Sequence, residues 1–167
     1  MTDVVTDEVA EPEPYRHTGY LLRRAQQLHV ATWARIVSTD ISSVQYSILV
    51  ILDRKGELSQ RELCDEVDLD RSTIADLAAR MERRGLIARR RDPADGRRKT
   101  VGLTTHGRAE RMRLQRLVDQ VEDALTGALT GPARDGLRDT LRTMLAQQDL
   151  HGRHEPSGFA DFMSVAP

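Results

Sequence analysis

The sequence has few of the residues that would support a disulfide, a membrane span or an aromatic core. Its single cysteine excludes a disulfide within the chain and fits a reducing cytoplasm. No apolar run approaches the ~20 residues that span a membrane, and the acidic N-terminus is unlike a secretory signal. Only six residues are aromatic, and Leu, Ala and Arg dominate. We therefore expect a cytoplasmic, mainly helical protein without a membrane partner.

The chain also lacks the patterns of an enzyme or a metal site. It has no nucleophile–base constellation and no Gly-rich phosphate loop. Its five histidines have neither close His-x-x-x-His spacing nor accompanying cysteine pairs, which zinc sites combine. His151 and His154 alone would chelate only weakly. We expect no catalysis, no cofactor and no metal.

Two short segments in the middle of the chain have the start and stop signals of a helix-turn-helix. Ser59 and Glu62 form a capping box that begins the first helix. After a turn, Asp70 caps a second helix over 71–84, and Gly85 ends it. The apolar side chains of the second helix share one face, which predicts packing against a core. They are Ile74, Leu77, Ala78 and Met81.

The other face of this second helix suits a recognition helix in a DNA major groove. Small hydroxyl groups lie near its start and arginines lie farther along. We expect Ser72 and Thr73 to reach base edges, and Arg80 and Arg83 to lie nearer the phosphates. The candidate DNA contacts of this helix are Arg71, Ser72, Thr73, Asp76, Arg80 and Arg83.

A tight turn rich in cations follows the helix-turn-helix. Gly96 supplies the backbone freedom of the turn, and segments 86–91 and 100–103 predict the two strands of a hairpin. A cationic hairpin of this size suits a narrow minor groove, where the negative potential is focused. We expect Arg97 to enter that groove, held by Asp95 across the turn. The candidate contacts of this hairpin are Asp95, Arg97, Arg98 and Lys99.

The charge of this region differs from that of the whole chain. Between Arg71 and Lys99 there are ten Lys or Arg and four Asp or Glu, a local charge of +6, whereas the whole chain carries −1. Such asymmetry indicates a nucleic-acid surface. The charge alone would suffice for a non-specific architectural DNA-binding protein, which stays open as an alternative.

The order of these elements resembles the MarR family of bacterial transcriptional regulators. Residues 95–107 contain its D-x-R-(x)n-L-T-x-x-G pattern, residues 42–49 look like the opening of its second helix, and residues 70–74 look like the start of its recognition helix. The resemblance implies a homodimer on a palindromic operator in double-stranded DNA. Such a dimer usually represses a nearby gene until a small effector binds. Ser42 and Ser43 complete the candidate DNA contacts.

The expected fold is mainly α, a winged helix-turn-helix with a two-stranded β wing and terminal helices that form a dimerisation bundle. We expect an acidic disordered tail at 1–14, a dimerisation and effector helix at 15–38, the DNA-binding domain at 39–104, dimerisation helices at 105–150 and a tail at 151–167. Intrachain packing of the terminal helices is the alternative to a dimer. The apolar residues on the last two helices that a second subunit would cover are Leu114, Leu117, Val118, Val121, Leu125, Leu137, Leu141, Met144 and Leu145.

The predicted helix at 15–38 carries polar groups within an apolar stripe. At 100° per residue, Gln26, His29 and Trp33 share one side, and Arg23 lies at its edge. Buried polar groups need partners, and a small carboxylate can supply them. Arg23 offers a bidentate fork, His29 a hydrogen bond and Trp33 an apolar wall. These four residues are the candidate effector site.

Residues 22–29 also resemble the first helix of family members that respond to aromatic carboxylic acids, whose effector pocket lies between this helix and the DNA-binding lobe. We therefore expect a hydroxylated benzoate or cinnamate as effector. In the alternative interpretation, Arg23 pairs with a carboxylate of a second subunit and His29 is an ordinary interface residue. The regulator would then be ligand-independent or redox-responsive, although we interpret Cys64 as a core thiol because no resolving cysteine exists.

Overall fold

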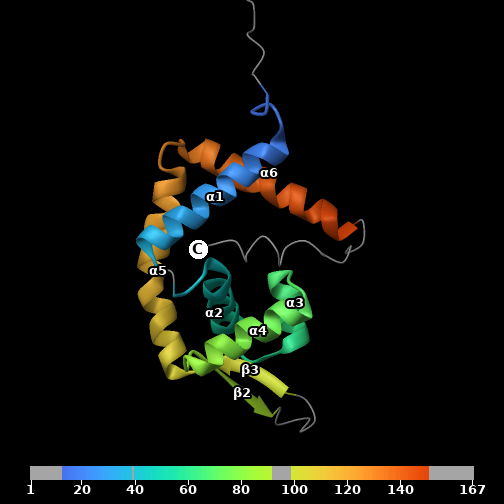
Figure 1. Cartoon of the computed structure of the whole chain (residues 1–167), viewed down its shortest axis with the longest axis vertical. Coiled ribbons are helices and arrows are strands. Elements are labelled where there is room, and N and C mark those ends of the chain that lie inside the picture. The colour runs from blue at the N-terminus through green and yellow to red at the C-terminus, as the bar shows by residue number, and fades with distance from the viewer. Residues whose placement is uncertain (1–12, 39, 92–98, 151–167) are drawn as a thin grey trace, which may run out of the picture.

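The computed structural model describes residues 13–38, 40–91 and 99–150 (Figure 1). Most of them are helical, and three short strands form one sheet. None of the described helices is long and apolar enough to cross a membrane. The elements are α1 (Thr18–Ile36), α2 (Ser43–Lys55), β1 (Leu58–Ser59), α3 (Gln60–Val67), α4 (Arg71–Arg83), β2 (Ile87–Arg91), β3 (Lys99–Leu103), α5 (Thr105–Thr126) and α6 (Gly131–Leu150).

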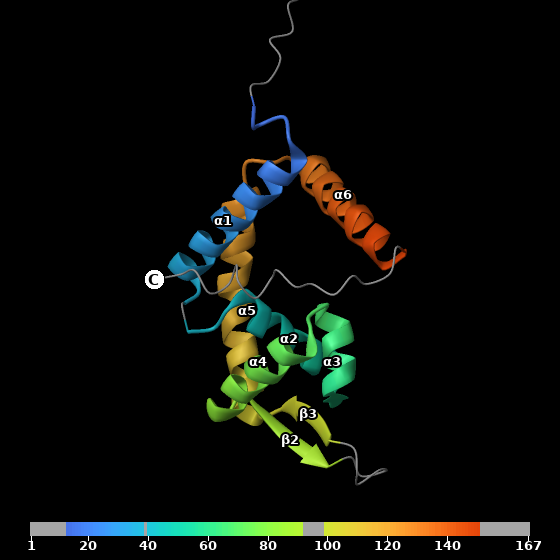
Figure 2. The same ribbon diagram turned by 45° about the vertical axis from the view of Figure 1, so that its right-hand side comes forward.

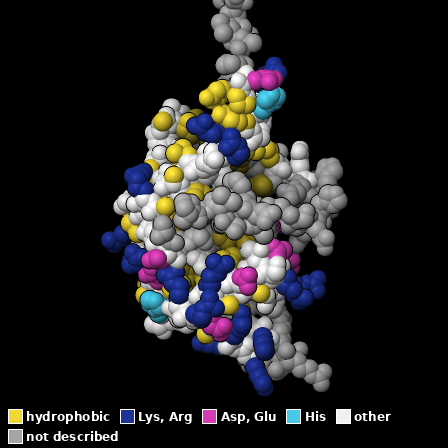
Figure 3. Space-filling view, viewed as in Figure 1, with side chains coloured by type: hydrophobic (Ala, Val, Ile, Leu, Met, Phe, Trp, Pro, Cys, Tyr) yellow, Lys and Arg dark blue, Asp and Glu magenta, His cyan; other side chains and the backbone are white. Residues whose placement is uncertain are grey.

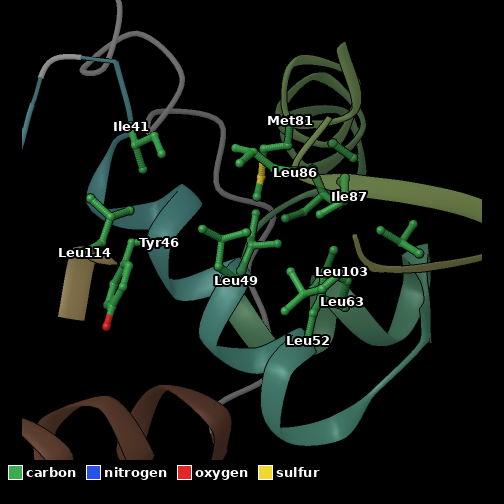
Figure 4. Close-up of a cluster of buried hydrophobic side chains, with 14 of the residues drawn as sticks. Ile41, Tyr46, Leu49, Leu52, Leu63, Met81, Leu86, Ile87, Leu103 and Leu114 are labelled. Atoms are coloured by element: carbon green, nitrogen blue, oxygen red, sulfur yellow. The ribbon is translucent and has the colours of Figure 1, made fainter. Parts of the chain in front are cut away.

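Helices α2, α3 and α4 pack with the sheet into a winged lobe. Its core takes side chains from each of these elements, as Figure 4 shows. Leu49 on α2, Leu63 on α3, Met81 on α4 and Ile87 on β2 are all fully buried. Burying one such side chain stabilises the fold by ~1.5–3 kcal/mol. The winged lobe therefore holds most of the buried core, which also includes Trp33 of α1 and Leu114 and Val121 of α5. Helices α3 and α4 form the predicted helix-turn-helix.

The predicted helix starts in the winged lobe are confirmed. Ser59 accepts a hydrogen bond from the Glu62 backbone N–H at 3.3 Å, and the Glu62 carboxylate accepts one from the Ser59 N–H at 2.7 Å. Asp70 caps α4 by accepting from the Thr73 N–H at 2.9 Å. Gly85 follows the end of α4 with a φ of 68°, in the left-handed region that favours glycine.

The predicted inward face of α4 is also confirmed. Ile74, Ala78 and Met81 are buried, and the half-buried Leu77 packs against the same core. The helix therefore fixes its orientation through this apolar face, and the opposite face is left for solvent or a partner.

The wing hairpin contains the two predicted strands, β2 and β3, paired antiparallel from Ile87 opposite Leu103 to Arg91 opposite Lys99. A third strand joins them, since β1 pairs antiparallel with β3 and places Leu58 opposite Val101. The sequence did not reveal β1, because two residues cannot show the alternation that identifies a strand. The strand order β1-β3-β2 attaches the wing firmly to the start of α3.

The L-T-x-x-G stretch connects the wing to α5. Thr104 caps α5 by accepting from the Gly107 N–H at 2.9 Å, and its hydroxyl donates to the Gly85 carbonyl at 2.6 Å. A Cβ at position 107 would lie 1.9 Å from the Leu86 carbonyl oxygen, so only glycine fits. This packing fixes the end of α4 against the start of α5.

The terminal helices extend beyond the winged lobe. α5 runs from the sheet to α1, with Leu114 and Val121 buried, while α6 follows a turn and projects to one side (Figures 1 and 2). Both α1 and α6 leave large apolar side chains uncovered. The exposed members are Leu21, Leu22, Leu28 and Val30 on α1, and Leu137, Met144 and Leu145 on α6.

Candidate DNA-binding surface and effector site

The outward face of α4 is polar and accessible. Arg71, Ser72, Asp76, Arg80 and Arg83 are all exposed on the side away from the core. The structure therefore brings most of the predicted recognition-helix residues onto one surface. Thr73 lies half-buried at its edge.

The hydroxyl groups at the start of α4 are already engaged. Ser72 and Thr73 both donate hydrogen bonds to the Asp70 carboxylate. These bonds, from Ser72 first and then Thr73, hold the pKa of Asp70 far below its usual range, so the carboxylate stays charged. As a result, the Ser72 oxygen faces outward as an acceptor, because its hydrogen points to Asp70.

The cations of the winged lobe fall into two groups. In the first, Arg84 donates to the Asp40 carbonyl, Arg89 approaches Glu82 at 3.6 Å and Arg90 lies 3.0 Å from Glu57. The second group consists of Arg71, Arg80 and Arg83 on α4, and Arg91 and Lys99 at the outer end of the wing strands. Their side chains form no hydrogen bond or ion pair within the described part of the chain, and we call them the unpaired cations.

This division matters for nucleic-acid binding. A cation that is already paired loses part of its attraction to a phosphate, whereas an unpaired, exposed cation can release counterions on binding DNA. Lys and Arg side chains gather over the winged lobe (Figure 3). The unpaired group lies along α4 and the wing, which are the two elements predicted to contact DNA. Asp95, Arg97 and Arg98 lie outside the described residues.

Glu57 holds the wing strands to the loop after α2. Its carboxylate accepts from the Thr100 hydroxyl at 2.8 Å and pairs with Arg90. Gly102 makes room for it, since a Cβ there would lie 2.8 Å from the Glu57 Cγ atom. Sequence reasoning missed these two contacts, because Glu57 is separated by 33 positions from Arg90 and by 43 positions from Thr100.

Ser42 and Ser43 lie at the start of α2. Ser42 is the N-cap, with its hydroxyl oxygen accepting from the Gln45 N–H at 3.2 Å, while Ser43 is half-buried. The Arg84–Asp40 hydrogen bond brings this region close to the end of α4. The Ser42 oxygen therefore already serves a structural role.

An aromatic cluster connects α1 to the winged lobe. The rings of His29 and Trp33 have centroids 5.9 Å apart, and the rings of Trp33 and Tyr46 are also 5.9 Å apart. The Tyr46 hydroxyl donates to the Gln115 side chain on α5 at 2.9 Å. Tyr46 and Gln115 were not predicted as site residues, because their contact spans 69 positions and no local pattern indicates it.

Burial sets the chemistry of this cluster. Trp33 is buried, and its indole N–H donates to the Ile41 carbonyl at 2.7 Å. His29 is half-buried, and burial lowers its pKa, which favours the neutral imidazole near neutral pH. A neutral imidazole offers one donor and one acceptor. The cluster thus combines an apolar wall with a few polar groups.

Arg23 and Gln26 are exposed, unlike His29 and Trp33. Arg23 donates to the Gln27 side chain at 3.2 Å, and its guanidinium lies 5.1 Å from the Tyr20 ring centroid. The structure therefore brings His29 and Trp33 together, but Arg23 does not contact either of them within the described part of the chain.

The linker between α1 and α2 is held from both sides. Trp33 binds the Ile41 carbonyl from α1, and Arg84, directly after α4, donates to the Asp40 carbonyl. The linker thus lies between the aromatic cluster and the end of the predicted recognition helix.

Neither a redox centre nor a metal site is evident in the described residues. Cys64 is half-buried against the core, and burial raises the pKa of its thiol, which opposes the reactive thiolate form. No group of three or more His, Cys, Asp or Glu side chains within the described ranges is placed to hold a metal ion.

Comparisons with known proteins agree with this arrangement. The sequence profile described as "MarR family" matches residues 39–98. The transcriptional regulator HosA of Escherichia coli O111:H- is 37% identical over 86 residues, which cover 52% of this chain and 63% of HosA. The chain thus matches less than two thirds of that curated relative's length.

Two solved structures are similar over most of the fold. The PcaV transcriptional regulator of Streptomyces coelicolor, in complex with its natural ligand, superposes with a TM-score of 0.76 at 35% identity, covering 82% of this chain and 97% of PcaV. The transcriptional repressor CouR, bound to a 23-mer DNA duplex, has a TM-score of 0.72 at 32% identity, covering 77% and 92%.

Proposed function

Because the chain belongs to the MarR family of winged helix-turn-helix transcriptional regulators, we propose that it is a homodimeric repressor released from a palindromic operator by a small aromatic carboxylic acid. The observation that carries this proposal is the contrast between two surfaces. Unpaired cations lie along α4 and the wing, and an aromatic cluster with a neutral histidine lies where α1 meets the winged lobe.

DNA binding follows from the first surface. Two recognition helices of a dimer would enter successive major grooves, about 34–36 Å apart. Ser72 and Thr73 lie at the end of α4 that would meet base edges, while Arg80 and Arg83 are free to meet phosphates. Arg97 would enter the minor groove from the wing tip, held by Asp95 across the turn.

Dimerisation would cover the apolar side chains of α1 and α6. Leu28 is 56% exposed and Leu145 is 64% exposed in the single chain. Exposed apolar surface of this kind is characteristic of an interface between chains. A two-fold arrangement would also present two copies of α4 to a palindrome.

The effector would bind against the aromatic cluster. Trp33 and Tyr46 are buried in the single chain, so an aromatic acid would have to displace their present neighbours to stack on these rings. The half-buried, neutral His29 can donate to its carboxylate or a ring hydroxyl. Arg23 would clamp the carboxylate, since its present contacts with Gln27 and Tyr20 are exposed and easily exchanged.

The linker between α1 and α2 would couple acid binding to the release of DNA. A ligand that displaces Trp33 disturbs the Ile41 carbonyl, and the neighbouring Asp40 carbonyl holds Arg84 at the end of α4. The acid must bind the state of lower DNA affinity more tightly, by ~1–3 kcal/mol for a typical coupling. Arg84→Met should therefore preserve acid binding but weaken the acid's effect on DNA affinity.

The test is a titration of aromatic acids against the protein–DNA complex. Labelled duplexes selected by the wild-type protein are challenged with hydroxylated benzoates and cinnamates, and DNA release is followed by fluorescence anisotropy. Arg23→Ala should bind DNA normally but resist release. Arg24→Ala is the matched control, because Arg24 lies beside Arg23 and instead contacts the Tyr20 hydroxyl. The aromatic-acid proposal is wrong if no acid releases the wild type, or if Arg23→Ala responds equally.

A further inference from the structure

One acidic side chain lies in the middle of the basic face of α4. Asp76 is exposed, one helical turn after Ser72 and one turn before Arg80. Its carboxylate forms no hydrogen bond or ion pair within the described part of the chain. The two other acidic residues of this region are both engaged, because Asp70 caps the helix and Glu82 pairs with Arg89.

A free carboxylate at this place needs a specific partner when the helix binds DNA. The phosphates repel it, and entry into a groove removes the water that solvates it. Hydrogen-bond donors on the bases compensate for both effects and are the partners that also carry sequence information. In the major groove these donors are the N4 amino group of cytosine and the N6 amino group of adenine.

The chemistry of the two bases favours cytosine over adenine as the partner of Asp76. In adenine the N6 amino group lies beside N7, whose lone pair would repel the carboxylate, whereas the cytosine amino group lies beside a C–H group. The Ser72 oxygen, one turn earlier, is also an acceptor because its hydrogen points to Asp70. The first half of α4 thus presents two acceptors, with Arg71 before them and Arg80 after them.

We propose that Asp76 is a specificity-determining residue that accepts a hydrogen bond from the N4 amino group of a cytosine in each half-site. This inference rests on the proposed role of α4 as the recognition helix. Guanine and thymine present keto oxygens at the same place, which repel the carboxylate. The operator therefore carries one position per half-site at which cytosine is preferred roughly tenfold over the keto bases, as for a single well-made base contact.

Removing the charge of Asp76 should change the affinity for DNA in the opposite direction from removing the charge of a neighbouring arginine. Removing the Arg80 guanidinium weakens binding to every duplex. Removing the Asp76 carboxylate takes away repulsion from the phosphates, so binding to random duplex becomes tighter while the preference for cytosine disappears. Asn at this position gains a donor as well as an acceptor and can pair bidentately with adenine.

The experiment selects binding sites from a randomised duplex library with the full-length protein and compares the enriched motifs. Asp76→Ala should lose the preference at one symmetric pair of positions, and Asp76→Asn should change it from cytosine to adenine. Asp123→Asn, the same charge change at an exposed site on α5, is the control and should select the wild-type motif. Thermal unfolding of each variant checks that the fold is retained.

Two results would overturn the inference. If the wild type selects a motif and both Asp76 variants select it with unchanged base frequencies, Asp76 does not read a base, although the regulator itself stands. If the wild type enriches no motif, the proposed sequence-specific function fails and this inference fails with it. The two failures are distinguished by the wild-type selection alone.

Discussion

The winged lobe and the terminal helices differ in how completely one chain satisfies their side chains. In the winged lobe, residues such as Leu49 and Leu63 are fully buried. The carboxylates of Glu57 and Glu82 pair with Arg90 and Arg89 of the same lobe. On α1 and α6, Leu28 and Leu145 remain largely exposed, and Arg23 has only surface contacts. The first region holds most of the buried core, whereas α1 and α6 also offer apolar surfaces to something outside the chain.

This contrast indicates where each kind of function resides. A rigid lobe with a closed core can present α4 and the wing in a fixed orientation, which base recognition requires. Surfaces left incomplete can change their partners, which a response to a second subunit or a small molecule requires. Substitutions in the two regions should therefore have separable effects.

The largest expected effect comes from the terminal helices. Leu141→Glu combined with Leu145→Glu places charge in the proposed interface between subunits, where it cannot be paired. The variant should sediment as a monomer and lose operator binding, because one recognition helix alone contacts only a half-site. The winged lobe should stay folded, since α6 contributes no residue to its buried core.

Met112→Glu is the control for this prediction. Met112 is 62% exposed but lies in the stretch of α5 that pairs with α2 through Arg108, Arg111 and Asp53, not on α1 or α6. The same change there should leave the oligomeric state intact. A double variant that remains dimeric would place the interface elsewhere and would break the contrast between the two regions.

The next effect concerns the two groups of cations. Arg80→Ala removes an unpaired cation of α4 and should weaken DNA binding several-fold. The slope of log affinity against log salt should fall by about one for each phosphate that the variant no longer neutralises. Arg90→Ala removes a cation held by Glu57 and should change the slope little. Anisotropy titrations at several salt concentrations measure the slope for both variants. Equal slopes would show that pairing with Glu57 does not reduce the contribution of Arg90 to DNA binding.

Arg97→Ala extends this prediction to the wing tip. If Arg97 enters the minor groove, its removal should cost more affinity than removal of Lys99, whose contribution should be mostly to the salt dependence. Affinity retained in Arg97→Ala would contradict the assignment of the wing as a minor-groove contact.

The smallest effect is a pH dependence at the aromatic cluster. Burial places the pKa of folded His29 below that of the unfolded chain, which is about 6.5. The unfolded state therefore binds more protons as pH falls below about 6.5, and stability is lost between that pH and the folded pKa. Thermal unfolding at pH 7.5 and 5.5 should show a smaller loss for His29→Gln than for the wild type. An identical loss in both proteins would assign the pH effect to other groups.

Local chemistry explains which parts of the molecule the sequence could predict. The caps at Ser59 and Asp70 and the inward face of α4 depend on residues within a few positions, so pattern reasoning found them. Tyr46 and Gln115 meet across 69 positions, and the two-residue strand β1 is too short for a period to appear. Such contacts depend on the tertiary fold.

Helix α1 also shows what a local sequence pattern cannot predict. Its 3.6-residue periodicity placed His29 and Trp33 on one side with Arg23 at the edge, and the structure does bring the rings of His29 and Trp33 together. Periodicity does not say how deep each residue lies. The buried side chains of α1 are Thr32 and Trp33 near its C-terminal end, whereas Arg23 lies on the exposed part of the helix.

The central claim, that DNA binding and acid sensing reside in separable regions, is tested most directly by isothermal titration of one active aromatic acid into DNA-free protein. The wild type, Arg80→Ala and Arg23→Ala are compared, each with its DNA affinity measured in parallel. We expect Arg80→Ala to bind the acid as the wild type does while losing DNA affinity, and Arg23→Ala to retain DNA affinity while losing the acid. Loss of both activities in either variant, or undiminished acid binding by Arg23→Ala, would contradict the claim.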